Sequence, residues 1–335
     1  MSKIKLSILC ITYNHEKFIR DTLDGFIAQK TDFEYEVLIH DDASTDNTAN
    51  IIREYQEKYP NLIKPIFQTE NQFSKGESIS KKFNFPRIAG EYVAMCEGDD
   101  YWIDTLKLQK QVNFLDANQD VYLCFHPVKE IYEDHSVEPN VFPSDYKVLN
   151  RQTLGLAELL KYNFISTSSV MYRWILKDNE SLFPSGIIPG DWFLHLLHAQ
   201  KGRIHCHLDI MSVYRRHQGG IWWERDKSNK FYIDHGIRLI AFYQAVEKQF
   251  NCDKQKEIIL FTYETLIAFL QHCRFEKIEE FSQRYPILYE RFIASGYDKS
   301  KIKALQYKKK YNKYKKLVIL SCVIYIFTFI LLFLR

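Results

Sequence analysis

Short apolar segments of strand length alternate with helical patterns over the first 125 residues, and this alternation constrains the fold more than any other feature of the sequence. The apolar segments, which contain many β-branched and aromatic residues, cover 5–12, 35–40, 62–68, 91–96 and 121–125. Between them, apolar residues recur at the spacing of amphipathic helices. Because strands that alternate with helices form a parallel sheet with helices on both faces, we predict an α/β fold with a mostly parallel central sheet.

Polar residues follow three of these predicted strands at the point where each strand ends. Tyr13 and Asn14 follow the first strand, Asp41 and Asp42 follow the second, and an acidic cluster at 97–100 follows the fourth. Helix capping would explain the Ser and Thr residues that come after the Asp pair, but it does not require two adjacent carboxylates that repel each other. Ligands of such sheets bind at the carboxyl ends of the strands, so we expect one shared pocket there.

The acidic cluster has the sequence Glu97-Gly98-Asp99-Asp100. Three carboxylates within four residues are unfavourable unless a cation lies among them. Carboxylate oxygens are the ligands that Mg²⁺ and Mn²⁺ prefer, and such an ion could neutralise a departing nucleoside diphosphate. The alternative is an acidic surface turn, because Gly-Asp-Asp also occurs where no metal binds.

Five short segments in this order along the chain are more specific than any one of them alone. They are SILCITYN at 7–14, DDASTDNT at 41–48, EGDDYW at 97–102, GDW at 190–192 and YRRHQGG at 214–220. Together they resemble the family 2 glycosyltransferases, which are inverting enzymes with the GT-A nucleotide-diphospho-sugar fold. The resemblance extends over about residues 4–222.

The resemblance implies which residues bind the donor. Thr12, Tyr13 and Asn14 would line the nucleotide pocket, and Asp42 would contact the base or the ribose of a UDP-sugar. Ala43 stands where the family usually has Gly, which changes the freedom of the turn but removes no ligand.

The family's metal-binding acidic motif corresponds to Glu97, Asp99 and Asp100. The resemblance implies Mn²⁺ or Mg²⁺ held mainly by Asp99 or Asp100, with Asp99 also next to the donor. Glu97 stands where Asp is common, so it would reach the ion through water or bind the ribose instead.

Catalysis would depend on Asp191, the family's general base. By itself, the Gly190-Asp191 pair is better explained as the start of a helix, and only its position in the family pattern reverses that preference. Arg215 and His217 lie where the family closes over the diphosphate. Inverting transfer is one displacement at the anomeric carbon, and it needs a base on the acceptor hydroxyl and charge relief on the leaving diphosphate.

The second half of the chain shows fewer strands. Residues 164–173 are predicted to form a strand, 191–200 a helix, and about 231–300 mostly helices. We divide the chain into a nucleotide-sugar-binding half (1–125), an acceptor and catalytic-base half of the same domain (126–222), a helical extension (223–306) and a basic segment with a membrane anchor (307–335).

The anchor is predicted from residues 317–334, which are apolar and carry no charge. Six lysines and three tyrosines lie between residues 307 and 316, and such a flank favours the cytoplasmic side of a membrane. We therefore expect a membrane-anchored protein with its catalytic body in the cytoplasm. The alternatives are a buried or partner-binding helix and a helix that enters only one leaflet.

Charge argues against nucleic acid as a partner. The chain has 45 basic and 42 acidic residues, but seven of the basic ones lie beyond residue 307, which leaves a slightly acidic body. The predicted function is metal-assisted transfer of a sugar from a nucleotide-diphospho-sugar to a lipid-linked or polysaccharide acceptor, as in cell-surface polysaccharide synthesis. The alternatives are a non-catalytic nucleotide-sugar-binding membrane scaffold and a sugar nucleotidyltransferase, whose glycine-rich phosphate loop is missing after the first strand.

Overall fold

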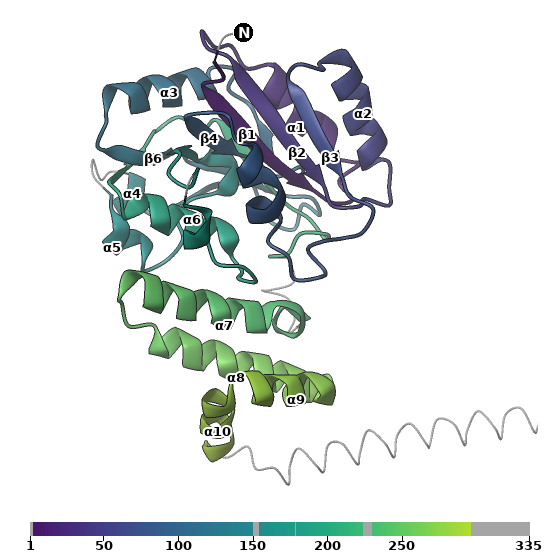
Figure 1. The fold of residues 1–335 in the computed structure, drawn as a ribbon, viewed down its shortest axis with the longest axis vertical. Helices are drawn as coiled ribbons and strands as arrows, with labels where there is room; N and C mark the ends of the chain where they lie inside the picture. The colour runs from purple at the N-terminus through teal and green to yellow at the C-terminus, as the bar shows by residue number, and fades with distance from the viewer. Residues whose placement is uncertain (1–2, 150–153, 178, 224–229, 296–335) are drawn as a thin grey trace, which may run out of the picture. The chain divides into compact units, whose positions relative to one another are not determined.

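The computed structural model describes residues 3–149, 154–177, 179–223 and 230–295. The chain divides into two compact units, Met1–Trp223 and Glu224–Arg335. Each unit is built around its own secondary structure, a pair of sheets in the first and helices in the second (Figure 1).

A seven-stranded sheet with the order β10-β6-β9-β4-β1-β2-β3 forms the centre of the first unit. Its strands are β1 (Leu6–Thr12), β2 (Tyr35–Asp41), β3 (Ile63–Phe67), β4 (Tyr92–Met95), β6 (Val121–Phe125), β9 (Met171–Arg173) and β10 (Arg203–Cys206). All neighbours are parallel except β9, which is antiparallel to both β4 and β6. The sheet is therefore mixed but mostly parallel, as predicted, with β9 as an antiparallel strand that the sequence did not predict.

Burial on both faces explains why the parallel strands form where the sequence predicts them. The side chains of Leu6, Ile8 and Cys10 on β1 are fully buried, and so are those of Val37 and Ile39 on β2. Such strands read as continuous apolar segments rather than as an alternation. Helices α1 (Ile19–Ile27), α2 (Thr48–Lys58) and α3 (Lys107–Ala117) contribute apolar faces to this core. Figure 1 shows α2 beside the edge strand β3.

A second, four-stranded sheet was not predicted. Its order is β5-β11-β7-β8, and its strands are β5 (Tyr101–Trp102), β7 (Val128–Tyr132), β8 (Asn140–Phe142) and β11 (Ser212–Arg216). The antiparallel pairing of β11 with β5 brings the segment that follows β11 next to the acidic cluster that precedes β5. This small sheet therefore joins two parts of the sequence that lie more than 100 residues apart.

The predicted strand at 164–173 forms only at its end, as β9. Residues Thr167–Ser169 instead form a 3-10 turn, in which the Ser169 hydroxyl donates to the carbonyl of Ser166 at 2.7 Å. Serine and threonine hydroxyls compete with strand pairing in this way. The other short elements of the unit are α4 (Tyr146–Leu149), α5 (Leu156–Leu159), a π-helical turn (Ser80–Asn84) and 3-10 turns at Phe85–Arg87 and Glu180–Leu182, and α6 (Gly190–Ala199) forms as predicted.

The second unit is helical where it is described, as the sequence predicts. Its helices are α7 (Lys230–Phe250), α8 (Gln255–Gln271), α9 (Phe275–Arg284) and α10 (Pro286–Ala294). A search of the described residues found no helix with the length and apolar character needed to cross a bilayer. The predicted anchor at 317–334 lies outside the described residues.

Candidate active site

The ends of β1, β2 and β4 meet at one edge of the central sheet. The amide of Asp42 donates to the carbonyl of Thr12 at 3.0 Å, and the amide of Gly98 donates to the carbonyl of Ile11 at 2.9 Å. A Cβ atom on Gly98 would lie only 2.5 Å from Thr12 Oγ1, so glycine permits this close approach. The three polar segments that follow these strands are therefore direct neighbours.

The turn after β1 is held by hydrogen bonds to the turn after β2. Asn14, with φ of 56°, accepts from the amide of Thr45 through Oδ1 at 2.7 Å, and its own amide donates to Ser44 Oγ at 2.9 Å. Thr12 is buried, and its hydroxyl lies 3.1 Å from His15 Nδ1. Tyr13 is 42 % exposed. Tyr13 and Asn14 are both exposed, so both side chains are open to a ligand.

The Asp42 carboxylate is buried and binds backbone amides. It accepts from the amides of Gln72 at 2.8 Å and Phe73 at 3.0 Å, and His40 Nε2 lies 3.5 Å from Oδ1. Burial alone would raise the pKa of Asp42, but the neighbouring His40 imidazole and the hydrogen bonds from the two amides outweigh it and lower that pKa. Asp42 therefore stays ionised and fixes the segment after β3 to the edge of the sheet.

Asp99 lies between two histidines. His217 Nε2 is 3.0 Å from Asp99 Oδ2, and His15 Nε2 is 3.8 Å from the same oxygen. The ligand atoms of the three side chains all lie within 4.8 Å of one another, and Asp99 Oδ1 is buried without a hydrogen-bond partner among the described residues. Burial works to raise the pKa of Asp99, but the two imidazoles lower it overall. An ionised carboxylate with two imidazoles is a donor set that suits a divalent transition ion.

Asp100 lies apart from this group and is bound to the segment at the end of β11. Its Oδ1 accepts from the amide of Arg215 at 2.9 Å, and burial followed by the charge of Asp99 raises its pKa well above the ordinary value. The Arg215 guanidinium donates to the carbonyl of Asp99 at 3.0 Å, pairs with Asp21 and lies 4.2 Å from the centre of the Tyr101 ring. Arg215 is therefore engaged with the acidic cluster itself.

Glu97 and Asp191 interact electrostatically. The Glu97 side chain is exposed, but the protein around its carboxylate removes part of its hydration. This loss of hydration, together with the charges of Asp99 and Asp191, raises the pKa of Glu97. Asp191 lies in the first turn of α6, where its Oδ2 accepts from Thr167 Oγ1 at 3.1 Å. Burial raises the pKa of Asp191, although hydrogen bonds from the Trp192 amide and the Thr167 hydroxyl oppose the rise. A carboxylate with a raised pKa is suited to act as a general base.

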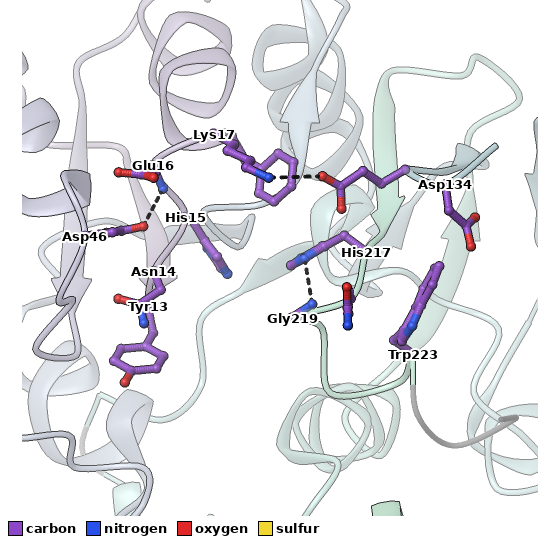
Figure 2. A pocket seen from close by; sticks show the side chains of 13 residues that line it. Tyr13, Asn14, His15, Glu16, Lys17, Asp46, Asp134, His217, Gly219 and Trp223 are labelled. Carbon is purple, nitrogen blue, oxygen red and sulfur yellow. Dashed lines mark hydrogen bonds and ion pairs between the residues drawn. The ribbon is translucent and has the colours of Figure 1, made fainter. Parts of the chain in front are cut away.

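A pocket of about 700 Å³ opens between the turn after β1 and the segment after β11. Figure 2 shows His15 and His217 on its facing sides, with Tyr13 and Asn14 on the side of β1 and Trp223 on the other. Of the predicted site residues, Tyr13, Asn14 and His217 line this pocket. The others do not: Thr12, Asp42, Glu97, Asp99, Asp100, Asp191 and Arg215.

The sequence did not predict the partners that the structure gives to two further side chains. His15 joins the group around Asp99, and Thr167 binds the predicted base. The signal for His15 was its place three residues after Thr12, just beyond the end of a strand. For Thr167, the hydroxyl-rich stretch at 166–169 was visible, but its partner on α6 was not.

Comparison with known proteins gives a consistent result. The model of the family described as Glycosyl transferase family 2 matches residues 7–178. An uncharacterized protein of Mycobacterium tuberculosis is 41% identical over 256 residues, which is 76% of this chain and 71% of that protein. A relative from Escherichia coli, named UDP-Glc:alpha-D-GlcNAc-diphosphoundecaprenol beta-1,3-glucosyltransferase WfaP, is 26% identical over 270 residues, 80% of this chain and 95% of that protein.

Among solved structures, S. aureus TarS 1-349 in complex with UDP-GlcNAc superposes with a TM-score of 0.55 at 20% identity, over 87% of this chain and 80% of that chain. This likeness shows the fold, and the mixed sheet of the first unit corresponds to the GT-A-type arrangement that the sequence motifs predicted. Because the family model covers more than half of the sequence, this chain is a member of glycosyl transferase family 2.

Proposed function

We propose that this glycosyltransferase transfers a sugar from a UDP-sugar to a lipid-linked or glycan acceptor with inversion at the anomeric carbon. The observation that carries the proposal is that one unit contains both the Asp99 group, which could hold a divalent ion, and the Asp191 carboxylate, whose charge raises the pKa of Glu97. The names of WfaP, with UDP-Glc, and of TarS, with UDP-GlcNAc, support a UDP-sugar as donor.

A divalent ion fits the group formed by His15, Asp99 and His217. The buried Asp99 Oδ1, which has no partner among the described residues, is a ligand atom free for such an ion. Two imidazole nitrogens beside one carboxylate favour Mn²⁺ over Mg²⁺, which prefers oxygen ligands. When bound, the ion would offset negative charge on the leaving diphosphate.

The charge of the pocket supports the need for a cation. Four carboxylates, those of Glu16, Asp46, Glu133 and Asp134, line it, and Lys17 contributes positive charge. This excess of negative charge would repel a diphosphate if no cation were present. A volume of about 700 Å³ is ample for a nucleotide-sugar.

The protein's own residues supply the remaining steps. Asp191 would take the proton from the acceptor hydroxyl as that oxygen attacks the anomeric carbon and the bond to the diphosphate breaks. Tyr13 would contact the nucleotide base, and Asp42 would shape the donor site by holding the segment after β3. Arg215 would keep Asp99 and Asp100 in register with the segment that ends at His217.

The apolar segment and the relatives support a lipid-linked acceptor. The name of WfaP specifies a diphosphoundecaprenol acceptor, which is a membrane lipid. An anchor at 317–334 on the cytoplasmic side would keep the catalytic unit next to such a lipid. Within this scheme, residues 1–125 bind the donor, 126–222 hold the acceptor and the base, 223–306 form a helical extension, and 307–335 contact the membrane.

The test is a screen of the purified protein with Mn²⁺ against a panel of nucleotide sugars, by thermal shift and by donor turnover. We expect one UDP-sugar to raise the melting temperature and to be consumed when an acceptor lipid is supplied. Asp191→Asn should lower turnover by about a thousandfold or more and leave the Mn²⁺-dependent thermal shift intact, because it removes the base but not the donor site.

Three outcomes would contradict the proposal. A protein that binds the nucleotide-sugar but shows no transfer in either form would be a scaffold. Formation of a nucleotide-sugar from a sugar phosphate and a nucleoside triphosphate would identify a nucleotidyltransferase. Full turnover by Asp191→Asn would remove Asp191 as the base.

A further inference from the structure

The Thr167 hydroxyl forms a hydrogen bond with the predicted base. It donates to Asp191 Oδ2 at 3.1 Å, and it is the only side chain in the described part of the chain that donates to this carboxylate. We infer that Thr167 is a positioning residue that fixes the rotation of the Asp191 carboxylate and leaves Oδ1 for the acceptor hydroxyl. The inference rests on the proposed function, in which Asp191 is the base.

The turn that carries Thr167 is fixed from three elements. Trp102 Nε1 on β5 donates to the carbonyl of Ser168 at 2.9 Å, and Gln111 Nε2 on α3 donates to the carbonyl of Ser169 at 3.0 Å. The Ser168 hydroxyl lies 3.1 Å from that of Ser212 on β11. Ser168 and Ser169 are fully buried. Because the backbone of the turn is held in this way, the Thr167 hydroxyl is presented to Asp191 from a rigid support.

Two of these elements, β5 and β11, flank two members of the Asp99 group. β5 begins two residues after Asp99, and β11 ends one residue before His217. The turn at 167–169 therefore connects the base to the framework that holds the candidate metal ligands. Displacement at one carbon requires the base and the leaving-group side to keep a fixed separation, and a shared framework provides it.

Removing the hydroxyl has two separate consequences. The carboxylate gains freedom to rotate, so fewer encounters are productive. It also loses a hydrogen bond that favours its ionised form, so its pKa rises further. The other groups that share its field are Glu97, whose pKa the charge of Asp191 raises, and Tyr172 on β9, whose pKa it also raises. Neither supplies a replacement positive charge.

The experiment compares Thr167→Val, which keeps the shape but removes the donor, with Thr167→Ser, which keeps the donor. We expect Thr167→Val to lower kcat about tenfold, to leave the KM for the UDP-sugar within about twofold, and to move the acidic limb of the kcat profile up by about one pH unit. Thr167→Ser should keep kcat and the acidic limb close to those of the unaltered protein.

Ser168→Ala is the matched control, because its hydroxyl lies in the same turn but contacts Ser166 and Ser212 rather than Asp191. It should leave the acidic limb in place. An unshifted limb in Thr167→Val, or the same shift in Ser168→Ala, would overturn the inference. An inactive Asp191→Asn combined with a normal Thr167→Val would reject the role of Thr167 alone, whereas an active Asp191→Asn would reject the base itself.

Discussion

The Asp99 carboxylate lies between imidazoles that come from distant parts of the first unit. His15 follows β1, and His217 follows β11, 118 positions after Asp99. The acidic motif was readable from the sequence because its members are adjacent. The two histidines were not readable as a group, since only the pairing of β11 with β5 brings them together.

Substitution of either histidine should weaken binding of Mn²⁺. We expect His15→Gln and His217→Gln each to reduce the affinity for Mn²⁺ by about tenfold or more, because each removes one nitrogen ligand while Asp99 remains. Electron paramagnetic resonance of free Mn²⁺ during titration of the protein measures this directly, without any turnover. His272→Gln is the control, since His272 is exposed at the end of α8 in the second unit. Equal affinities in all three variants would show that the ion binds elsewhere.

Ala43 has a φ of 64°, a left-handed conformation that disfavours residues with a Cβ atom. Ala43→Gly should therefore raise the free energy of unfolding by about 0.5 kcal/mol, as relief of strain exceeds the added entropy of the unfolded chain. Chemical denaturation is the measurement. Ala28→Gly, at an exposed position with φ of −69°, should destabilise the protein instead, and a gain in stability there would contradict this explanation.

At the scale of single elements, strands buried on both faces were predicted to within a residue or two. β6 forms over the predicted residues, and β1 and β2 differ by one residue at an end. Elements that depend on distant partners were not predicted. β5 has only two residues, and it is a strand solely because β11 pairs with it. The turn at 167–169 replaced a predicted strand because its hydroxyls bond locally.

Helix α3 buries a lysine in the core of the first unit. Lys107 is fully buried, donates to Gln111 Oε1 at 2.7 Å and lies 4.3 Å from the centre of the Trp102 ring. Burial lowers the pKa of Lys107 to about 7. In the unfolded chain the amine titrates near its ordinary value, so between these two pH values the unfolded state binds more protons. The contribution of Lys107 to stability is therefore least favourable below about pH 7 and improves as the pH rises towards about 10.

Lys107→Met should remove this dependence. We expect the variant to be more stable than the unaltered protein at neutral pH by roughly 3 kcal/mol, and the difference to shrink as the pH approaches about 10. Urea denaturation at a series of pH values is the measurement. Lys110→Met, on the exposed side of the same helix, should show no such convergence. A pH-independent difference for Lys107→Met would mean that packing, not charge, controls the effect.

For the whole molecule, the residues of the candidate site all belong to the first unit, Met1–Trp223. The motifs in the sequence were sufficient to predict the family and the α/β fold class, whereas the roles of the acidic cluster and of Asp191 stay predictions. The separate structural roles of the site residues were not predictable. Asp42 binds backbone amides, and Arg215 binds the acidic cluster. Those partners depend on how distant segments pack, and no local pattern encodes them.

The proposed anchor can be tested in the full chain. We expect the protein to float with vesicles that contain anionic lipid, because lysines 308–316 and the apolar segment would act together. Ile324→Lys combined with Phe327→Lys should abolish flotation, since each charge costs about 2.5–3.5 kcal/mol at the centre of a membrane helix. Substitution of the six lysines by Gln is the matched control for the electrostatic part. Failure of the unaltered chain to float would reject the anchor.

The separation of 118 positions between Asp99 and His217 has a consequence for how the protein is made. During synthesis, the ribosome releases Asp99 long before it releases His217, so the growing chain contains only part of the candidate metal-binding group. In the proposed metal site, an ion would bind tightly only after β11 has docked beside β5. Metal affinity would then develop late in folding, and one measurement of it would report on almost the entire length of the first unit.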